Sequence, residues 1–386
     1  MLLTIIIFVV VLSVLVFAHE LGHFFSARFF GVKAEEFGFG FPPRAVGLYR
    51  NKFGKWKKVF GNIQIEKLEN NEDEKNHPAS KSTIYSLNWL PIGGFVKIKG
   101  ENGEGQSNND SFASKKIWKR IVILAAGVIM NIVLAWFLFS LGYLIGMPQS
   151  TAELGKSAKI SGENVLVMDV VPGSVAELSG LKAGDAILKI DDTKVALEKD
   201  VQDIIGSKKG EEVSLLINRD GASQVLKMTP EIKENGRAQI GISITAAGLV
   251  RYSFFPAIWE GARTVVWILE QIVVSFINLF ADLFHGQSVG DQFAGPVGIA
   301  GITGQAARMG FTYLLQFMAI LSLNLAIINI LPFPALDGGR ILFLLIEKIK
   351  GKPVRQELEV AFHNIGFLLL MALVAFITLK DIIKLF

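Results

Sequence analysis

The sequence predicts a multispan α-helical membrane protein with four transmembrane helices, a membrane-associated β-hairpin region and one extracytoplasmic α+β domain. Three observations support this fold class. Of the 386 residues, 51% are hydrophobic and 19% are charged, whereas charged residues make up about a quarter of a soluble globular domain. Several apolar runs are long enough to cross a bilayer. Lys and Arg gather in two of the segments that connect these runs, although the net charge is only +4.

The first transmembrane helix is predicted at residues 1–30. Residues 2–17 are apolar except for Thr4 and Ser13, and the motif HELGH follows at residues 19–23. A cleaved signal peptide is the competing interpretation. It fits poorly, because no Lys or Arg precedes the apolar run and no clean small-residue cleavage site follows it.

Three further apolar segments predict the remaining spans. They cover residues 116–147, in which Asn131 is the one strongly polar residue after the basic start at residues 116–120, then residues 311–340 and residues 362–386. A fourth stretch, within residues 250–290, carries Glu260, Arg263, Glu270 and Asp282 among aromatic residues. We expect this stretch to form an amphipathic helix that lies at the membrane interface and does not cross.

The basic residues orient the predicted helices. Residues 31–115, a β-rich loop that is cytoplasmic or membrane-associated, are dense in Lys and Arg, as is the connection between the third and fourth spans. The positive-inside rule places both in the cytoplasm and leaves residues 148–310 outside. The small net charge gives no indication of nucleic-acid binding. The chain has no cysteine, so metal ligands must come from His, Asp or Glu.

The HELGH motif predicts a metal centre. His19 and His23 are four residues apart, so on a helix both imidazoles lie on one face and can reach one ion. Glu20 lies beside them and can accept a proton from an activated water. The alternative is a pair of interfacial histidines, but that leaves an intramembrane Glu20 without a purpose, and such groups are normally functional.

A hydrolytic zinc ion needs a third protein ligand, and Asp337 is the best candidate. It stands in NILPFPALDGGR, residues 329–340, where two prolines end the third helix and two glycines permit a tight backbone path. His77, His285 and His363 lie in polar or connecting stretches, which favours surface positions. The alternative for Asp337 is an N-cap of a helix that begins near Arg340. In the predicted topology both HELGH and Asp337 reach the cytoplasmic half of the membrane.

The chain resembles the site-2 protease family, in its bacterial RseP-like group, over nearly its whole length. The shared features are HELGH, NxxPxPxLDGG at residues 329–339, FGFGFPP at 37–43, PIGGFVK at 91–97, and the segment 111–131 that ends in AGxxxN. The resemblance implies zinc-dependent cleavage of transmembrane segments. It implies that His19, His23 and Asp337 bind Zn2+, that Glu20 is the catalytic base, and that Asn329 lies near the substrate backbone. Asn131 matches a family asparagine, and Arg340 replaces a histidine of some relatives, a change from which we expect little effect on zinc.

A protease that cuts in the membrane must make its helical substrate extended, and an edge strand can pair with the unwound segment. Residues 84–90 and 94–98 predict a hairpin that turns near residues 91–93. From pattern alone, a surface hairpin packed on the helices is as well supported. The family resemblance favours substrate presentation, with Gly94, Phe95 and Val96 as positioning residues.

The outer domain, residues 155–235, resembles a single bacterial PDZ domain, where some relatives have two. Alternating apolar residues predict strands at 165–171 and 186–190, and residues 213–218 and 225–229 predict a hairpin around Asp220 and Gly221. We expect its binding loop near residues 160–164. The domain either binds a peptide or filters substrates by the size of their outer domains, and the sequence leaves both open.

The leading hypothesis is a zinc intramembrane endopeptidase of a bacterial inner membrane that cleaves single-span membrane proteins. By family resemblance, substrates are of the anti-sigma factor or remnant signal peptide type. The rival from another class is a non-catalytic membrane scaffold that docks partners through its PDZ-like domain. A scaffold has no use for Glu20 or for a carboxylate in a broken helix. A transporter would need repeated halves, which the sequence lacks.

Overall fold

The computed structural model describes residues 2–51, 53–61, 82–103, 105–150, 159–219, 222–232, 237–286 and 294–383. The described chain forms two compact units. Residues 1–138, 263–304 and 317–386 belong to the first unit, and residues 139–262 and 305–316 belong to the second.

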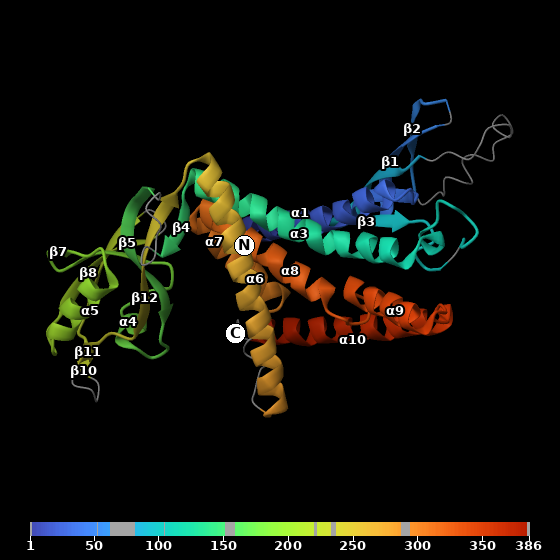
Figure 1. Cartoon of the computed structure of the whole chain (residues 1–386). Helices are drawn as coiled ribbons and strands as arrows, with labels where there is room; N and C mark the ends of the chain where they lie inside the picture. Colours follow the sequence, from blue (N-terminus) through green and yellow to red (C-terminus); the bar gives the residue numbers. More distant parts are fainter. Residues whose placement is uncertain are drawn as a thin grey trace. The chain divides into compact units, whose positions relative to one another are not determined.

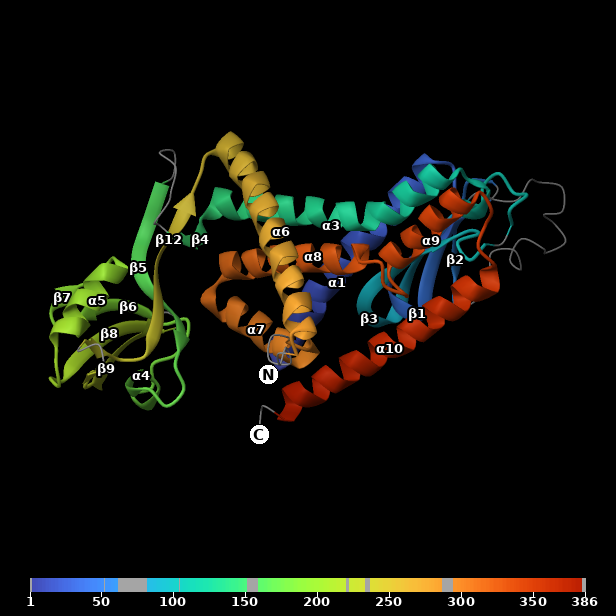
Figure 2. The ribbon, with the colours of Figure 1, turned by 60° about the horizontal axis from the view of Figure 1, so that its bottom comes forward.

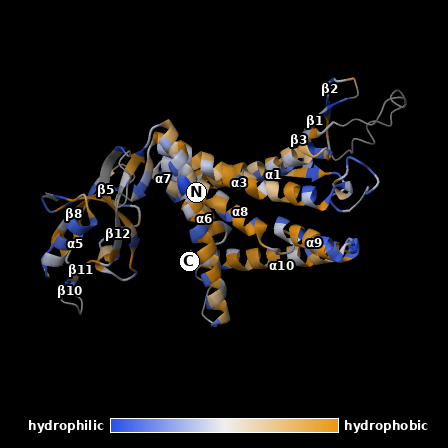
Figure 3. Cartoon of the chain, in the orientation of Figure 1, coloured by the Kyte–Doolittle hydropathy of each residue, from blue (hydrophilic) through white to orange (hydrophobic). Residues whose placement is uncertain are grey.

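Seven helices outside the strand-rich part of the chain dominate the described structure (Figure 1). They are α1 (Leu2–Phe29), α3 (Ile117–Ile145), α6 (Phe254–Phe284), α7 (Pro296–Met309), α8 (Phe311–Ile330), α9 (Asp337–Lys350) and α10 (Gln356–Ile383). Within the described residues, α1, α3, α6, α8 and α10 are long and apolar enough to cross a membrane, and Figure 3 shows apolar residues along them. Because α6 meets the same criterion as the predicted spans, its interfacial position remains a prediction.

The predicted third segment, residues 311–340, contains the end of one helix and the start of another. The prolines predicted that the helix ends within this segment, and α8 stops at Ile330 before a separate helix, α9, begins at Asp337. Pro332 and Pro334 lie between them, and proline both lacks the N–H that a helix needs and restricts the residue before it.

A three-stranded sheet with the order β2-β1-β3 belongs to the first unit. Its strands are β1 (Ala34–Arg50), β2 (Trp56–Val59) and β3 (Ile84–Ile98), and a short 3-10 helix, η2 (Phe112–Ser114), follows them. The predicted pairing of residues 84–90 with 94–98 is wrong. Residues 36–39 of β1 lie between these two arms, pairing with 84–87 on one side and with 94–97 on the other.

Gly38 explains why β1 can enter between the two arms of β3. A Cβ atom at this position would lie 2.4 Å from the Phe95 ring and 2.7 Å from Ser86 Oγ. Only glycine therefore lets the three segments approach. A short-range hairpin signal cannot reveal such an insertion, because the inserted strand comes from about fifty residues earlier in the chain.

The β3 strand is attached to α1 at two points. Ser13 Oγ donates to the Pro91 carbonyl at 3.1 Å and accepts from the Gly93 N–H at 3.2 Å, while the Val96 N–H donates to Glu20 Oε2 at 3.0 Å. Seven helical residues rise about 10 Å, and three strand residues also span about 10 Å. The strand therefore runs alongside the part of α1 that carries HELGH.

The second unit is an α+β domain. Its strands are β4 (Met147–Ser150), β5 (Lys159–Val170), β6 (Ala186–Ile190), β7 (Thr193–Lys194), β8 (Val213–Arg219), β9 (Ala222–Met228), β10 (Glu231–Ile232), β11 (Ala238–Gln239) and β12 (Ile242–Arg251), and its helices are α4 (Val175–Leu178) and α5 (Glu198–Ser207). The main sheet has the order β4-β12-β5-β6-β8-β9, and β7 pairs with β6. Its core is aliphatic, with Val165, Ile187, Ile190, Leu215 and Ile217 almost fully buried.

Two features of this domain bear on the sequence predictions. The β8–β9 hairpin forms as expected, although its predicted turn at residues 220 and 221 lies outside the described residues. A cavity of about 450 Å³ lies between α5 and residues 237–244, lined by Val201, Ile205, Ile240 and Ile242 among others. The sheet also continues past the predicted boundary at residue 235, because β12 pairs with β4 and β5.

We expect the buried carboxylate of Asp185 to stabilise the folded state of the second unit. It is 1% exposed and accepts hydrogen bonds from Arg219 at 2.6 and 2.7 Å and from the Lys182 N–H at 2.8 Å. Asp185→Ala removes the buried carboxylate that accepts these three hydrogen bonds and leaves Arg219 without its anionic partner there, so we expect a loss of about 3–5 kcal/mol in the free energy of unfolding of this unit. Hydrogen exchange of the β6 and β8 amides measures it. Exposed Asp192→Ala is the control and should change exchange by less than about 0.5 kcal/mol; equal effects would contradict the prediction.

Candidate metal centre

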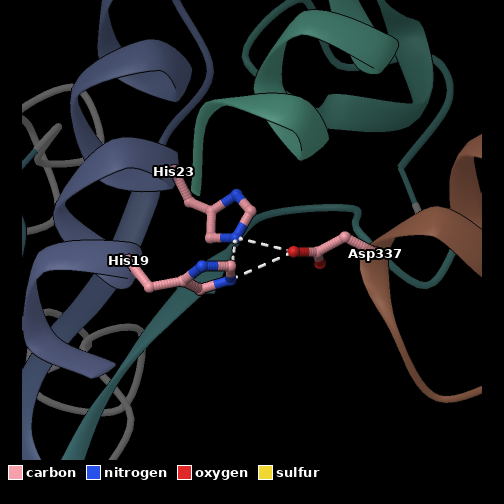
Figure 4. Close-up of side chains that lie close together, drawn as sticks. All are labelled: His19, His23 and Asp337. Atoms are coloured by element: carbon pink, nitrogen blue, oxygen red, sulfur yellow. Dashed lines mark hydrogen bonds and ion pairs between the residues drawn. The ribbon is translucent and has the colours of Figure 1, made fainter. Parts of the chain in front are cut away.

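The two histidines of HELGH face the interior of the first unit from consecutive turns of α1. His19 and His23 are 7% and 6% exposed, and their Nε2 atoms lie 3.1 Å apart. Figure 4 shows both rings turned toward the same point in space. The four-residue spacing therefore does what the sequence predicted, placing two imidazole nitrogens side by side.

Asp337 reaches the same point from the other end of the chain. Its Oδ2 atom lies 3.0 Å from His19 Nε2 and 3.4 Å from His23 Nε2 (Figure 4). The alternative role as an N-cap is not what the structure shows. Helix α9 begins at Asp337 itself, and its N-cap is the extended Leu336, without a side-chain cap hydrogen bond. The Asp337 carboxylate is therefore available to the histidines.

The three atoms suit a zinc ion. Zinc bonds of about 2.0–2.1 Å in tetrahedral geometry separate neighbouring ligand atoms by about 3.3 Å, close to the 3.0–3.4 Å found here. Asp337 Oδ2 is buried and has no hydrogen-bond partner among the described residues, a costly situation that a cation would relieve. Two imidazoles and a carboxylate are a ligand set found in zinc hydrolases.

The outer nitrogens of both histidines meet polar groups of α3. His23 Nδ1 lies 2.9 Å from the Ile123 carbonyl, which can only accept, so Nδ1 carries the proton and the Nε2 lone pair faces the cluster. His19 Nδ1 lies 3.3 Å from Asn131 Nδ2, while Asn131 Oδ1 has no partner among the described residues. Turning the amide over would give Nδ1–H of His19 the acceptor that a metal-binding histidine requires.

Helix α3 also leaves room for the cluster. A Cβ atom on Gly127 would lie 2.4 Å from His23 Nε2 and 2.7 Å from His19 Nε2. Helix α1 packs equally closely against α3 at Gly22, because a Cβ atom on Gly22 would lie 2.2 Å from the Ala126 carbonyl oxygen. Sequence reasoning used Asn131 from this helix but missed Gly127, although the small residues at 125–127 were a signal of close helix contact.

Glu20 lies next to the histidine cluster in the sequence and contacts β3. It belongs to the same turn of α1 but is not one of the three clustered residues, and its Oε2 atom accepts the hydrogen bond from Val96 of β3. Val96 is thus the predicted substrate-positioning residue that contacts HELGH. Gly94 is buried against β1, Phe95 is half-buried, and Asn329 is half-buried in the last turn of α8.

The remaining histidines do not join the cluster where they are described. His77 lies outside the described residues. His285 contacts the Ala281 carbonyl of α6. His363, predicted as a surface residue, is instead half-buried on α10, where its Nδ1 atom accepts a hydrogen bond from the Ala335 N–H at 2.9 Å.

Comparisons with known proteins identify the family of the chain. The model of peptidase family M50 matches residues 7–60 and 76–373. A relative from Clostridium perfringens, which carries the name zinc metalloprotease, is 35% identical over 96% of both chains. The regulator of sigma-W protease RasP of Bacillus subtilis is 32% identical over 99% of both chains. Among solved structures, the PDZ domain of the SdrC-like protein of Listeria monocytogenes matches 22% of this chain and 92% of its own, with 28% identity and a TM-score of 0.21.

The packing of Gly127 generates a prediction. Gly127→Ala places a methyl group against both imidazoles, so we expect zinc affinity to fall at least about tenfold, as when the surroundings of metal ligands are disturbed. Chelator competition followed by elemental analysis of the purified protein measures this. Gly301→Ala on α7 is the matched control, because a Cβ atom there meets nothing within 4 Å. Unchanged affinity in Gly127→Ala would contradict the proposed packing.

Proposed function

Because the chain belongs to peptidase family M50, we propose which of its residues bind zinc and which residue is the catalytic base. The protein is a zinc metalloendopeptidase of the site-2 protease type, a bacterial membrane protein that acts in regulated intramembrane proteolysis. In our proposal His19, His23 and Asp337 hold the zinc ion. Glu20 is the catalytic base.

The observation that carries the proposal is the convergence of Asp337 on the two histidines, at 3.0 and 3.4 Å, from a segment more than three hundred residues away in the sequence. When bound, zinc supplies the Lewis acidity that makes water a nucleophile at neutral pH and polarises the scissile carbonyl. Glu20 accepts the proton of the attacking water at a carboxylate oxygen and delivers it to the leaving amide nitrogen. Asn329, in the last turn of α8, contacts the substrate backbone.

We infer that the substrate becomes extended along β3. Residues 94–97 pair with β1 on one side only among the described residues, and the Val96 N–H points to Glu20. A substrate strand that adds to the free side of residues 94–96 would present its peptide bonds next to Glu20. The attachment of β3 to α1 at Ser13 and Glu20 supports this, because it fixes the height of the strand relative to HELGH.

For the membrane arrangement we propose four transmembrane helices, α1, α3, α8 and α10, with α6 at the interface. The basic connections then lie in the cytoplasm and the second unit lies outside, in a bacterial inner membrane. HELGH and Asp337 occupy the cytoplasmic half. A membrane crossing by α6 would put α8 in the opposite orientation, so the shared metal centre favours an interfacial α6.

For the second unit we propose a PDZ-like domain that binds a peptide in the cavity between α5 and residues 237–244. Val201, Ile205 and Ile240 supply aliphatic groups to a lining that also contains polar residues, and Arg237 stands at it as a cation that would suit a terminal carboxylate. For the substrates we propose single-span membrane proteins of the anti-sigma factor or remnant signal peptide type. A relative named regulator of sigma-W protease supports the first type.

The scaffold alternative is not favoured, because the chain belongs to a peptidase family.

Because we propose Glu20 as the base and not as a zinc ligand, its substitution should lower the cleavage rate without releasing zinc. Glu20→Gln keeps the size of the side chain but removes the base, so cleavage of a transmembrane test peptide should fall at least about 100-fold while bound zinc stays unchanged. The exposed Glu270→Gln on α6 is the matched control and should cleave normally. Normal cleavage by Glu20→Gln would contradict the assignment of the base.

The role of β3 predicts that the Val96 N–H is needed and its side chain is not. Val96→Pro removes the donor to Glu20 and breaks the strand, so we expect cleavage to be lost while zinc remains bound. Val96→Ala keeps the N–H and should cleave within a few-fold of the native protein. Equal rates for the two variants in a peptide cleavage assay would rule out presentation along this strand.

A further inference from the structure

The segment that carries Asp337 passes through an unusual backbone conformation. Ala335, two residues before Asp337, has φ = 73°, and only Asp191 shares a positive φ among the described non-glycine residues. The left-handed region is unfavourable for a residue with a Cβ atom, so such a residue keeps this conformation only where its surroundings impose it. The direction in which Asp337 leaves the turn depends on this residue and on the extended Leu336 that follows it.

A histidine of α10 contacts this turn directly. The Ala335 N–H donates to His363 Nδ1 at 2.9 Å, so Nδ1 is an acceptor and the proton of the neutral ring is on Nε2. Nε2 is buried and makes no hydrogen bond within the described part of the chain. The rings of Phe343 and Phe362 lie 5.8 and 6.0 Å from the imidazole and restrict its orientation. Among the described groups, the polar contact of this ring is therefore the one through Nδ1.

Three glycines allow α10 and the start of α9 to pack closely against the turn. A Cβ atom on Gly366, one turn beyond His363 on α10, would lie 1.9 Å from Pro334 Cβ. A Cβ atom on Gly339 would lie 2.3 Å from the Phe333 carbonyl oxygen, and one on Gly338 would lie 2.2 Å from the Ile330 carbonyl oxygen. The turn is thus packed between the start of α9 and the side of α10, and Figure 2 shows these two helices side by side.

We propose that His363 is a positioning residue for the metal centre: by accepting the Ala335 N–H at Nδ1, it stabilises the left-handed turn that directs Asp337 toward His19 and His23. This inference rests on the proposed metal site. Without the acceptor, the left-handed conformation of Ala335 keeps only the 3.3 Å hydrogen bond from the Leu336 N–H to the Phe333 carbonyl and the packing of the turn, and we expect its intrinsic preference for a negative φ to prevail. Relaxation redirects the next residues, and the Asp337 carboxylate moves away from the two imidazoles.

The test compares three substitutions of His363 in the full-length protein, purified in detergent, with zinc affinity measured by chelator competition. The amide oxygen of Asn reaches about as far as Nδ1, whereas that of Gln reaches about as far as Nε2. We expect His363→Asn to keep zinc affinity within about threefold of the native value. His363→Gln and His363→Leu should lose at least about tenfold, the scale on which metal sites respond to lost supporting contacts.

A second substitution separates positioning from misfolding. Ala335→Gly removes the steric cost of a positive φ, so in the His363→Leu background it should recover most of the lost zinc affinity. Ala335→Gly alone should change affinity little. A His363→Leu protein that simply fails to fold would not be rescued, and that result would overturn the proposal.

Two controls keep this proposal distinct from the proposed function. His285→Leu removes an exposed imidazole that follows α6 and lies near the Ala281 carbonyl, and it should leave zinc affinity unchanged. His19→Ala removes a ligand and should lose zinc whatever His363 does. Loss in His19→Ala with native affinity in His363→Leu, or equal affinities in the Asn and Gln variants, would overturn the positioning role. Retention of zinc by His19→Ala would overturn the metal site itself.

Discussion

The Asp337 carboxylate, placed between two buried imidazoles, is the interaction on which the rest of this structure depends. An ionisable side chain inside an apolar helix bundle costs free energy unless a partner or a metal compensates it. Here Asp337 Oδ2 lies 3.0 and 3.4 Å from the Nε2 atoms of His19 and His23. The start of α9 must therefore approach the part of α1 that carries HELGH. Much of the first unit serves this approach: α3 supports the histidines from behind, β3 holds Glu20, and α10 contacts the turn that leads into α9.

Two features allow α9 to approach α1. Glycines let the helices pack closely, and ion pairs hold α9 to its neighbours. Gly22 and Gly127 let α1 and α3 come together around the imidazoles, and Gly338 lets α9 fold back on the end of α8. Helix α9 is then tied to its neighbours by charge. Arg340 pairs with Glu101 in the loop after β3, and Arg120 of α3 pairs with Glu347 at 3.1 Å. The sequence prediction treated Arg340 only as a replaced histidine, whereas the structure gives it a partner one turn from Asp337.

The sequence was informative where the signal is local. A five-residue motif on one helix is enough to place His19 and His23 together, and the prolines at 332 and 334 correctly indicated the end of a helix before Asp337. It failed where partners are distant. Nothing near residues 84–98 indicates that β1 inserts between their two arms, and nothing near His363 indicates that its acceptor role concerns a turn 28 residues earlier. Such contacts arise from packing between elements, and their local patterns resemble those of an ordinary hairpin and an ordinary surface histidine.

The central claim is that these two histidines and this aspartate form one zinc site, and X-ray absorption at the zinc edge of the purified protein tests it most directly. The claim predicts a first shell of nitrogen and oxygen at about 2.0–2.1 Å, without sulfur, and with the outer-shell scattering of two imidazoles. In Asp337→Ala the imidazole scattering should persist in whatever zinc remains, with one oxygen fewer. A native spectrum that shows fewer or more than two imidazoles, or an Asp337→Ala spectrum identical to the native one, would contradict the account.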